Sequence, residues 1–322
     1  MSRQSHRAGF LIAAATLGIV LALPASAPAA TKPTVATGGT TRLASTTVRL
    51  WGTVDPNGAK TTYLFQYGTT NLYGTSTPIT VAGNGTKKLL VKIDVGGLAP
   101  ATTYHYRLVA RNAGGVASGA DRKFRTKPQP LVLSLGAQPN PVRYGRGMIL
   151  EGLLTGTGNA GRPVQLQASP FPHVAGFVNV GNPQVASAQG VFAFTLLSVG
   201  INTQFRVVLP SKPQVFSPVV GVGVAPRVAT RVSARTVFTG ARVRFSGTVR
   251  PARRGARVVI QRKRGKRWRY VAATKSRRGG QQFSRYARRI RIRRGGSYRV
   301  LVESADGSYI NSTGRTIKIR RR

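Results

Sequence analysis

The sequence predicts an all-β protein built from three β-sandwich domains in tandem after a signal peptide. Glycine and proline are frequent, with 38 and 19 copies among 322 residues, and short runs rich in threonine and valine alternate apolar with polar residues. After residue 30, no long apolar stripe with the 3.6-residue period of a helix occurs. Hydrophobic residues make up 41% of the chain, which is enough for packed cores in two or three domains.

The first 29 residues have the order of a secretory signal peptide. The basic start MSRQSHR is followed by the uncharged apolar run AGFLIAAATLGIVLAL, and Ala27-Pro28-Ala29 offers a small-residue cleavage site. The apolar run is shorter than the roughly 20 residues that a membrane-spanning helix needs, so an uncleaved anchor is the weaker alternative. We therefore expect a secreted, extracellular protein with no stable transmembrane segment after cleavage. Any retention on the cell surface would be non-covalent.

The sequence offers little catalytic chemistry. Cysteine is absent, which removes disulfides, thiolate metal sites and cysteine nucleophiles. Acidic residues number 6, and Asp55, Asp94, Asp121 and Asp306 lie in or beside glycine-rich turn sequences. Motifs of serine hydrolases, metalloproteases and nucleotide-binding loops are missing. We expect no enzyme, no catalytic residues, no cofactor and no metal site.

The first predicted domain covers residues 30–127. It contains four alternating runs separated by turn sequences: TTVRLWGTVDPNG, TTYLFQYGTTNLYG, KKLLVKIDVGGLAP and TTYHYRLVARNAGG. The segment LAPATTY (98–104), followed by Arg107, Ala110 and Asn112, resembles a pattern of fibronectin type III domains, and DPNG…YLFQYGTT resembles the secreted bacterial variants of that family. The resemblance implies that Tyr104 is structural and forms a corner in which its hydroxyl returns to the backbone.

Trp51 is the candidate ligand-stacking residue of this domain. Val48, Leu50, Gly52 and Val54 share one face of the predicted strand, which leaves Trp51 on the other face. A tryptophan there could stack on a sugar or a base. An aromatic side chain on the second face of a sheet more often covers its cross-strand neighbours.

Residues 128–225 and 226–322 are predicted to be two copies of one Ig-like sandwich, the second rich in arginine. Four blocks recur in the same order at an offset of 93 to 95 residues: GRGMILEG with GARVRFSG, PVQLQ with RVVIQ, NTQFRVVL with GGSYRVLV, and VVGVGV with GRTIKI. These blocks resemble bacterial immunoglobulin-like repeats of extracellular proteins. Short proline-bearing linkers are expected at 125–128 and 225–227.

The positive charge is concentrated in the last domain. The chain has 50 basic and 6 acidic residues. Residues 226–322 hold 30 of the basic and 2 of the acidic residues, whereas residues 128–225 hold 5 basic residues and 1 acidic residue. In the last domain, basic residues alternate with apolar ones, which indicates strands with a buried face and a basic outer face. Trp268 and Tyr270 are expected to be buried and Arg267 and Arg269 exposed. Residues 262–266 and 275–280 are expected to be hairpin tips.

Such a surface favours an external polyanion as partner, because the two acids of the domain cannot neutralise it. We expect it to bind anionic cell-wall or extracellular polymers. The polyanion-binding candidates are Arg262, Lys263, Arg264, Lys266, Arg267, Arg269, Arg289, Arg291 and Arg293.

Three alternatives remain open. The same surface could bind extracellular nucleic acid, with Trp268 or Tyr270 stacking on bases. The fibronectin-like domain could instead bind carbohydrate through Trp51. Arginine could also be abundant through codon usage, with the charged face acting only as a solubility device. The favoured interpretation is a non-enzymatic cell-surface or extracellular-matrix protein whose sandwich domains act as spacers and adhesion modules.

Overall fold

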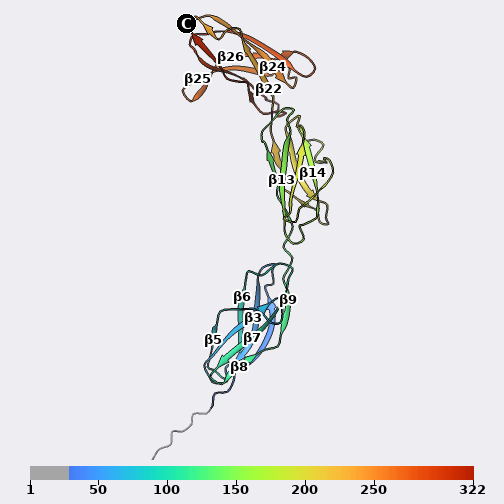
Figure 1. Ribbon diagram of the computed structural model, residues 1–322, viewed down its shortest axis with the longest axis vertical. Helices are drawn as coiled ribbons and strands as arrows, with labels where there is room; N and C mark the ends of the chain where they lie inside the picture. The colour runs from blue at the N-terminus through green and yellow to red at the C-terminus, as the bar shows by residue number, and fades with distance from the viewer. Residues whose placement is uncertain (1–28) are drawn as a thin grey trace, which may run out of the picture. The chain divides into compact units, whose positions relative to one another are not determined.

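The computed structural model describes residues 29–322, which contain strands but no helix (Figure 1). One compact unit ends at Lys127 and the other covers Pro128–Arg322. Three hydrophobic clusters lie between pairs of sheets, which confirms the predicted all-β sandwich fold. The predicted signal peptide lies outside the described residues, apart from residue 29. In the described part of the chain, no helix is long and apolar enough to cross a membrane.

The first sandwich consists of two antiparallel sheets packed face to face. Its strands are β1 (Thr34–Thr41), β2 (Val48–Asp55), β3 (Thr61–Gly68), β4 (Thr75–Ser76), β5 (Thr80–Gly83), β6 (Leu89–Val95), β7 (Thr103–Asn112), β8 (Gly115–Ser118) and β9 (Arg122–Arg125). One sheet has the order β1-β2-β6, and the other has the order β4-β3-β7-β8, with β5 beside β3 and β9 beside β7.

Two local features of this sandwich match the sequence prediction. Val48, Leu50 and Val54 of β2 are buried, as the alternation indicates. The hydroxyl of Tyr104 accepts a hydrogen bond of 2.9 Å from the backbone N–H of Ala99, which confirms the predicted tyrosine corner.

The second sandwich packs its core between a sheet centred on β13 and a sheet with the order β15-β14-β18-β19. Its strands are β10 (Val132–Leu133), β11 (Gly136–Gln138), β12 (Val142–Arg143), β13 (Met148–Thr155), β14 (Pro163–Pro170), β15 (Val178–Asn179), β16 (Gln184–Val185), β17 (Val191–Leu196), β18 (Thr203–Leu209), β19 (Val215–Phe216), β20 (Val220–Val222) and β21 (Val224–Ala225). Strand β13 pairs with β10, β11 and β17, and β12 pairs with β21 in parallel.

The third sandwich has sheets with the orders β22-β24-β28-β27 and β23-β31-β29-β25-β26. Its strands are β22 (Arg227–Val232), β23 (Thr236–Val237), β24 (Arg242–Arg250), β25 (Arg257–Arg264), β26 (Arg267–Lys275), β27 (Arg277–Arg278), β28 (Ser284–Arg291), β29 (Gly296–Val302), β30 (Ser312–Thr313) and β31 (Ile317–Arg321). As in the second sandwich, a short strand near the start (β23) pairs in parallel with the last strand (β31).

Three of the four repeated sequence blocks lie on equivalent strands of these two sandwiches, namely β13 and β24, β14 and β25, and β18 and β29. Strands β13 and β24 carry a glycine at the same position, Gly152 in the former and Gly247 in the latter. A Cβ atom on Gly152 would lie 2.2 Å from the carbonyl oxygen of Ser134, and one on Gly247 would lie 1.8 Å from that of Ala229. Both sandwiches therefore require glycine where the neighbouring strand approaches closely.

The second and third sandwiches also make contacts beyond the predicted linker at 225–227. The side-chain amide of Asn202 donates to the carbonyl of Gly307 at 2.8 Å, and the N–H of Ile310 donates to the carbonyl of Val224 at 3.0 Å. The ring of Tyr309 lies 6.4 Å from that of Tyr144. The loop between β29 and β30 is thus docked on the second sandwich.

One of the two predicted hairpin tips is correct. Strands β25 and β26 are joined by a turn at Gly265 and Lys266. The tip predicted at 275–280 is misplaced: the hairpin turn lies at 279–283, between β27 and β28, and residues 275–278 instead cross between the different sheets of β26 and β27. Ser276 is buried between them, and its N–H donates to the carbonyl of Ala256 at 2.9 Å, so the chain is held in place where it crosses from one sheet to the other.

The prediction that Trp268 and Tyr270 are buried in the core is also wrong. The register of β25 and β26 shifts, so that Ile260 pairs with Ala272 whereas Gln261 pairs with Tyr270. The extra residue between these pairs is a β-bulge, which exchanges the two faces of the strand. Trp268 and Tyr270 therefore lie on the outer face, and Tyr270 is 62% exposed.

Candidate polyanion-binding surface

The outer face of the sheet β22-β24-β28-β27 is covered with arginines. Val243 and Phe245 of β24 are fully buried, so Arg242 and Arg244 point to the opposite, solvent side. The same alternation holds in β28 except at Arg288, which pairs with the buried Phe245 but is exposed. We define the arginine face as Arg227, Arg231, Arg242, Arg244, Arg250, Arg277, Arg285, Arg289 and Arg291, all of which are exposed.

The strand register places like charges directly opposite one another on this face. The four cross-strand pairs are Arg227 with Arg250, Arg242 with Arg291, Arg244 with Arg289, and Arg277 with Arg285. Opposed like charges destabilise a sheet by about 0.2 to 1 kcal/mol per pair. Electrostatic repulsion between these arginines therefore destabilises the free sheet, and a bound polyanion would reduce that repulsion.

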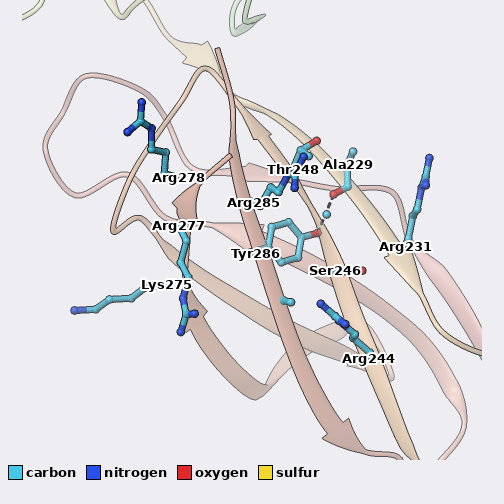
Figure 2. A pocket seen from close by; sticks show the side chains of 12 residues that line it. Ala229, Arg231, Arg244, Ser246, Thr248, Lys275, Arg277, Arg278, Arg285 and Tyr286 are labelled. Atoms are coloured by element: carbon cyan, nitrogen blue, oxygen red, sulfur yellow. Dashed lines mark hydrogen bonds between the residues drawn. The ribbon is translucent and has the colours of Figure 1, made fainter. Parts of the chain in front are cut away.

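A hollow of about 640 Å³ lies on this face. Its lining includes the small residues Ala229, Ser246 and Thr248, with arginines around them. In Figure 2, Arg231 and Arg244 lie on one side of the strand that carries Tyr286, and Lys275, Arg277 and Arg278 lie on the other. Arg285 lies between these two groups, beside Thr248, so the hollow has cationic side chains on both sides and in its middle.

Tyr286 holds this sheet together from its inner side. Its hydroxyl donates to the carbonyl of Ala229 at 2.9 Å and lies 2.6 Å from the hydroxyl oxygen of Thr230. Burial raises the pKa of Tyr286 to about 12, although the hydrogen bond with Thr230 opposes the shift. The phenol therefore stays neutral and adds no negative charge beneath the hollow.

The two acids of the third sandwich are already paired elsewhere. Glu303 lies 3.1 Å from the guanidinium of Arg257, and Asp306 lies 2.9 Å from that of Arg253. Burial acts to raise the pKa of Asp306, but hydrogen bonds from Ser308 and Arg253 outweigh it and hold the pKa below its usual value. The arginine face consequently has no acid of its own domain available to neutralise it.

A second hollow, of about 900 Å³, adjoins the first and shares Ala229 and Thr248 with it. Its lining includes Arg143 and Arg146 of the second sandwich together with Arg315 of the third. The cationic surface thus continues within the unit formed by residues 128–322.

The nine predicted polyanion-binding residues do not form one surface. Arg289 and Arg291 belong to the arginine face, and Arg293 is exposed just after β28. The other six lie on the β25–β26 hairpin of the opposite sheet: Arg262, Lys263, Arg264, Lys266, Arg267 and Arg269.

Sequence reasoning missed the residues that surround the hollow, above all Arg231, Arg244, Arg277 and Arg285. The alternation in RVATRV and RVRFSG marks the arginines of β22 and β24 as outward-facing. Those patterns do not show that β24 lies between β22 and β28, because strand neighbours are set by long-range pairing.

The opposite sheet presents a different surface, which we call the aromatic face: Gln261, Lys263, Trp268, Tyr270 and Arg299. The Nε of Arg299 donates to Oε1 of Gln261 at 2.8 Å, and its guanidinium carbon lies 4.3 Å from the centroid of the Trp268 ring. Burial lowers the pKa of Arg299, although the residue remains charged at neutral pH because arginine titrates far above it.

Trp51 packs against its own domain. It is partly buried, and a Cβ atom on Gly38 would lie 2.2 Å from its Cε3 atom, while one on Gly39 would lie 3.3 Å from its Nε1 atom. These two glycines lie at a register shift in β1. The geometry favours a role in covering this bulge, and ligand stacking by Trp51 stays a prediction.

The remaining histidines and carboxylates make isolated contacts. Nδ1 of His105 lies 2.8 Å from Asp121, which also accepts a hydrogen bond of 3.0 Å from Tyr73. Asp94 is hydrogen-bonded by Arg49 at 2.6 Å, which lowers its pKa. Within residues 29–322, no group of three or more histidine, cysteine or acidic side chains could hold a metal ion.

No protein-family model matches the sequence, and no curated protein matches it. Solved structures that resemble the chain include the FN1–FN3 domains of chicken CNTN1, with 17% identity over 90% of this chain and 100% of that one, at a TM-score of 0.29. A tetra-tandem repeat from the extending region of a large adhesion protein has 14% identity over 90% of this chain and 74% of that one, at a TM-score of 0.31. Domains A168–A170 of titin have 14% identity over 90% of this chain and 99% of that one, at a TM-score of 0.36. Scores this low carry no information on what this chain binds.

Proposed function

We propose that this chain is a secreted, non-enzymatic protein of the cell surface or extracellular matrix whose third sandwich binds anionic polymers of the cell envelope. The first two sandwiches act as spacer or adhesion modules. The arginine face supplies the binding surface, and the β25–β26 hairpin adds further positive charge on the opposite sheet.

The observation that supports this proposal best is the set of opposed arginine pairs on a folded sheet with no free acid nearby. A rigid sheet holds neighbouring guanidinium groups within a Debye length of one another, so their fields add. A polymer with many phosphates or sulfates would replace several of its own counterions at once when it binds. Guanidinium groups also match phosphate and sulfate oxygens with paired hydrogen bonds.

The test is to measure retention of the whole chain on purified wall polymer, on heparin and on inorganic polyphosphate over a range of salt concentrations. We expect retention on all three, with a logarithmic affinity that falls by about 0.7 to 0.9 per neutralised charge for each logarithmic unit of salt. Absence of retention at low ionic strength would overturn the proposal and favour the solubility explanation. Retention that survives high salt and is lost in Trp51→Ala would instead support carbohydrate binding by the first sandwich.

A further inference from the structure

We propose that the aromatic face is a second binding site, separate from the arginine face, and that it takes single-stranded nucleic acid. Bases would stack on Tyr270 beside the Trp268–Arg299 pair, while phosphates would contact the cations of the β25–β26 hairpin. This proposal does not depend on the arginine face, because the two surfaces belong to opposite sheets of the sandwich.

The Gln261–Arg299 pair recurs in all three sandwiches as a structural device. Gln66 and Arg107 are paired across β3 and β7, and Gln167 and Arg206 across β14 and β18. In each case the arginine Nε donates to the glutamine Oε1 at 2.8 Å. Each arginine also lies over an aromatic ring; Arg107, for example, lies 4.7 Å from the ring centroid of Tyr73.

The third sandwich departs from the second in how this arginine is covered. Arg206 lies over two rings, those of Phe177 at 4.2 Å and Phe216 at 4.4 Å. Phe216 belongs to β19, which pairs with β18; in the third sandwich, β30 pairs with β29 in the same way and has Thr313 at the corresponding position. The ring that Phe216 supplies is therefore replaced by a small polar side chain.

A planar ring from a ligand could occupy the space left by this replacement. Arginine guanidinium groups stack on flat π-systems, and aromatic side chains stack on bases of any sequence. Tyr270 is 62% exposed next to the site, in the same cross-strand row as Gln261 and Arg299. The site thus combines an exposed ring with a guanidinium group held in place.

The surrounding charge selects a ligand with both rings and phosphates. Lys263 lies opposite Trp268 in the ladder and shares its face of the sheet, whereas Arg267 and Arg269 add positive charge to the edge strand β26 from its other face. Single-stranded nucleic acid is the polyanion whose bases are free to stack, whereas duplex bases are already stacked on each other. Inorganic polyphosphate, which has neither bases nor sugar rings, would gain nothing from Tyr270.

The experiment titrates the whole chain with oligothymidylate and, separately, with inorganic polyphosphate, which has the same kind of charge without bases. The chain has 2 tryptophans, so a Trp51→Phe background leaves Trp268 as the fluorescent reporter. We expect oligothymidylate, but not polyphosphate, to quench Trp268. Tyr270→Ala should weaken oligothymidylate binding by roughly 5- to 100-fold, and Tyr270→Phe should retain it.

Phe238→Ala is the matched control, because Phe238 is another exposed aromatic residue of the same sandwich, at 68% exposure. It should leave both affinities unchanged. The proposal is overturned if Tyr270→Ala binds oligothymidylate as tightly as the parent, or if heparin shows the same dependence on Tyr270, which would mean a sugar site. Polyphosphate binding that persists in either of these cases would leave the arginine face intact, so the two proposals fail separately.

Discussion

The second and third sandwiches share one scaffold and differ in their surfaces. On the equivalent strands β13 and β24, Ile149 pairs with Thr195 where Arg244 pairs with Arg289. Four residues further along each strand, Leu153 and Val191 occupy the places of Thr248 and Arg285. Leu153 and Val191 are 38% and 52% exposed. The arginines of the third sandwich therefore replace uncharged residues at outward positions.

This difference bears on why arginine is so abundant. A codon preference would act on the whole chain, yet residues 128–225 hold 5 basic residues and residues 226–322 hold 30. A solubility device would be served as well by acids, which number only 2 in the third sandwich. The segregation of charge by domain supports a function for the arginine face.

The largest expected effect is the loss of stability when a large core side chain is truncated. It tests whether the cores of the second and third sandwiches are equivalent. Phe245 and Leu150 are both fully buried at matching positions. Phe245→Ala should lower the free energy of unfolding of the third sandwich by about 3 to 5 kcal/mol, and Leu150→Ala that of the second by about 2 to 5 kcal/mol. Peptide-resolved hydrogen exchange can follow each sandwich separately. A small loss in one and a large loss in the other would break the equivalence.

A smaller effect is expected at the shared glycine. Gly152→Ala and Gly247→Ala should each destabilise their sandwich by about 1 to 3 kcal/mol, because the added methyl group would collide with a backbone carbonyl. Urea unfolding of the third sandwich can be followed by Trp268 fluorescence in Trp51→Phe chains, and hydrogen exchange again reports on the second. If either variant were as stable as its parent, the close approach of the neighbouring strand would be disproved.

The smallest expected effect has the opposite sign. Removing one opposed pair with Arg244→Gln and Arg289→Gln should stabilise the third sandwich by about 0.2 to 1 kcal/mol at low salt, because like charges no longer face each other. The gain should shrink as salt is added. The matched change in the second sandwich, Ile149→Gln with Thr195→Gln, relieves no repulsion and should show no dependence on salt. A loss of stability in the arginine variant would mean that these side chains have structural roles.

Much of the scaffold can be predicted from the sequence, because alternation determines which residues are buried. The buried positions of β2 and β24 follow directly from the pattern, and the tyrosine corner follows from the fibronectin-like segment. The faces of β26 could not be predicted, because a single bulged residue exchanges them and Trp268 and Tyr270 then lie outside.

The candidate site was predicted less completely for a related reason. The sequence identifies which arginines point outward but not which strands are neighbours, so Arg289 and Arg291 were grouped with hairpin residues of the opposite sheet. The charged segment 275–278 runs directly into the glycine-bearing turn of the β27–β28 hairpin, so the composition indicates a turn here but not where it begins. The alternation does not show that β26 and β27 belong to different sheets, which depends on the pairing of β26 with β25 and of β27 with β28.

The central claim is that polyanion binding depends on the arginine face and not on net charge alone. The most direct test removes the same number of positive charges from two different places. One variant carries Arg244→Gln, Arg285→Gln and Arg289→Gln on the arginine face. The control loses the same number of charges from exposed lysines of the first sandwich: Lys60→Gln, Lys87→Gln and Lys88→Gln. The measurement is the salt dependence of polyphosphate affinity for the whole chain. We predict that the arginine variant reduces the logarithmic salt slope by about two to three and that the control leaves it nearly unchanged. Equal reductions in both variants would contradict the account, because net charge alone would then explain the binding.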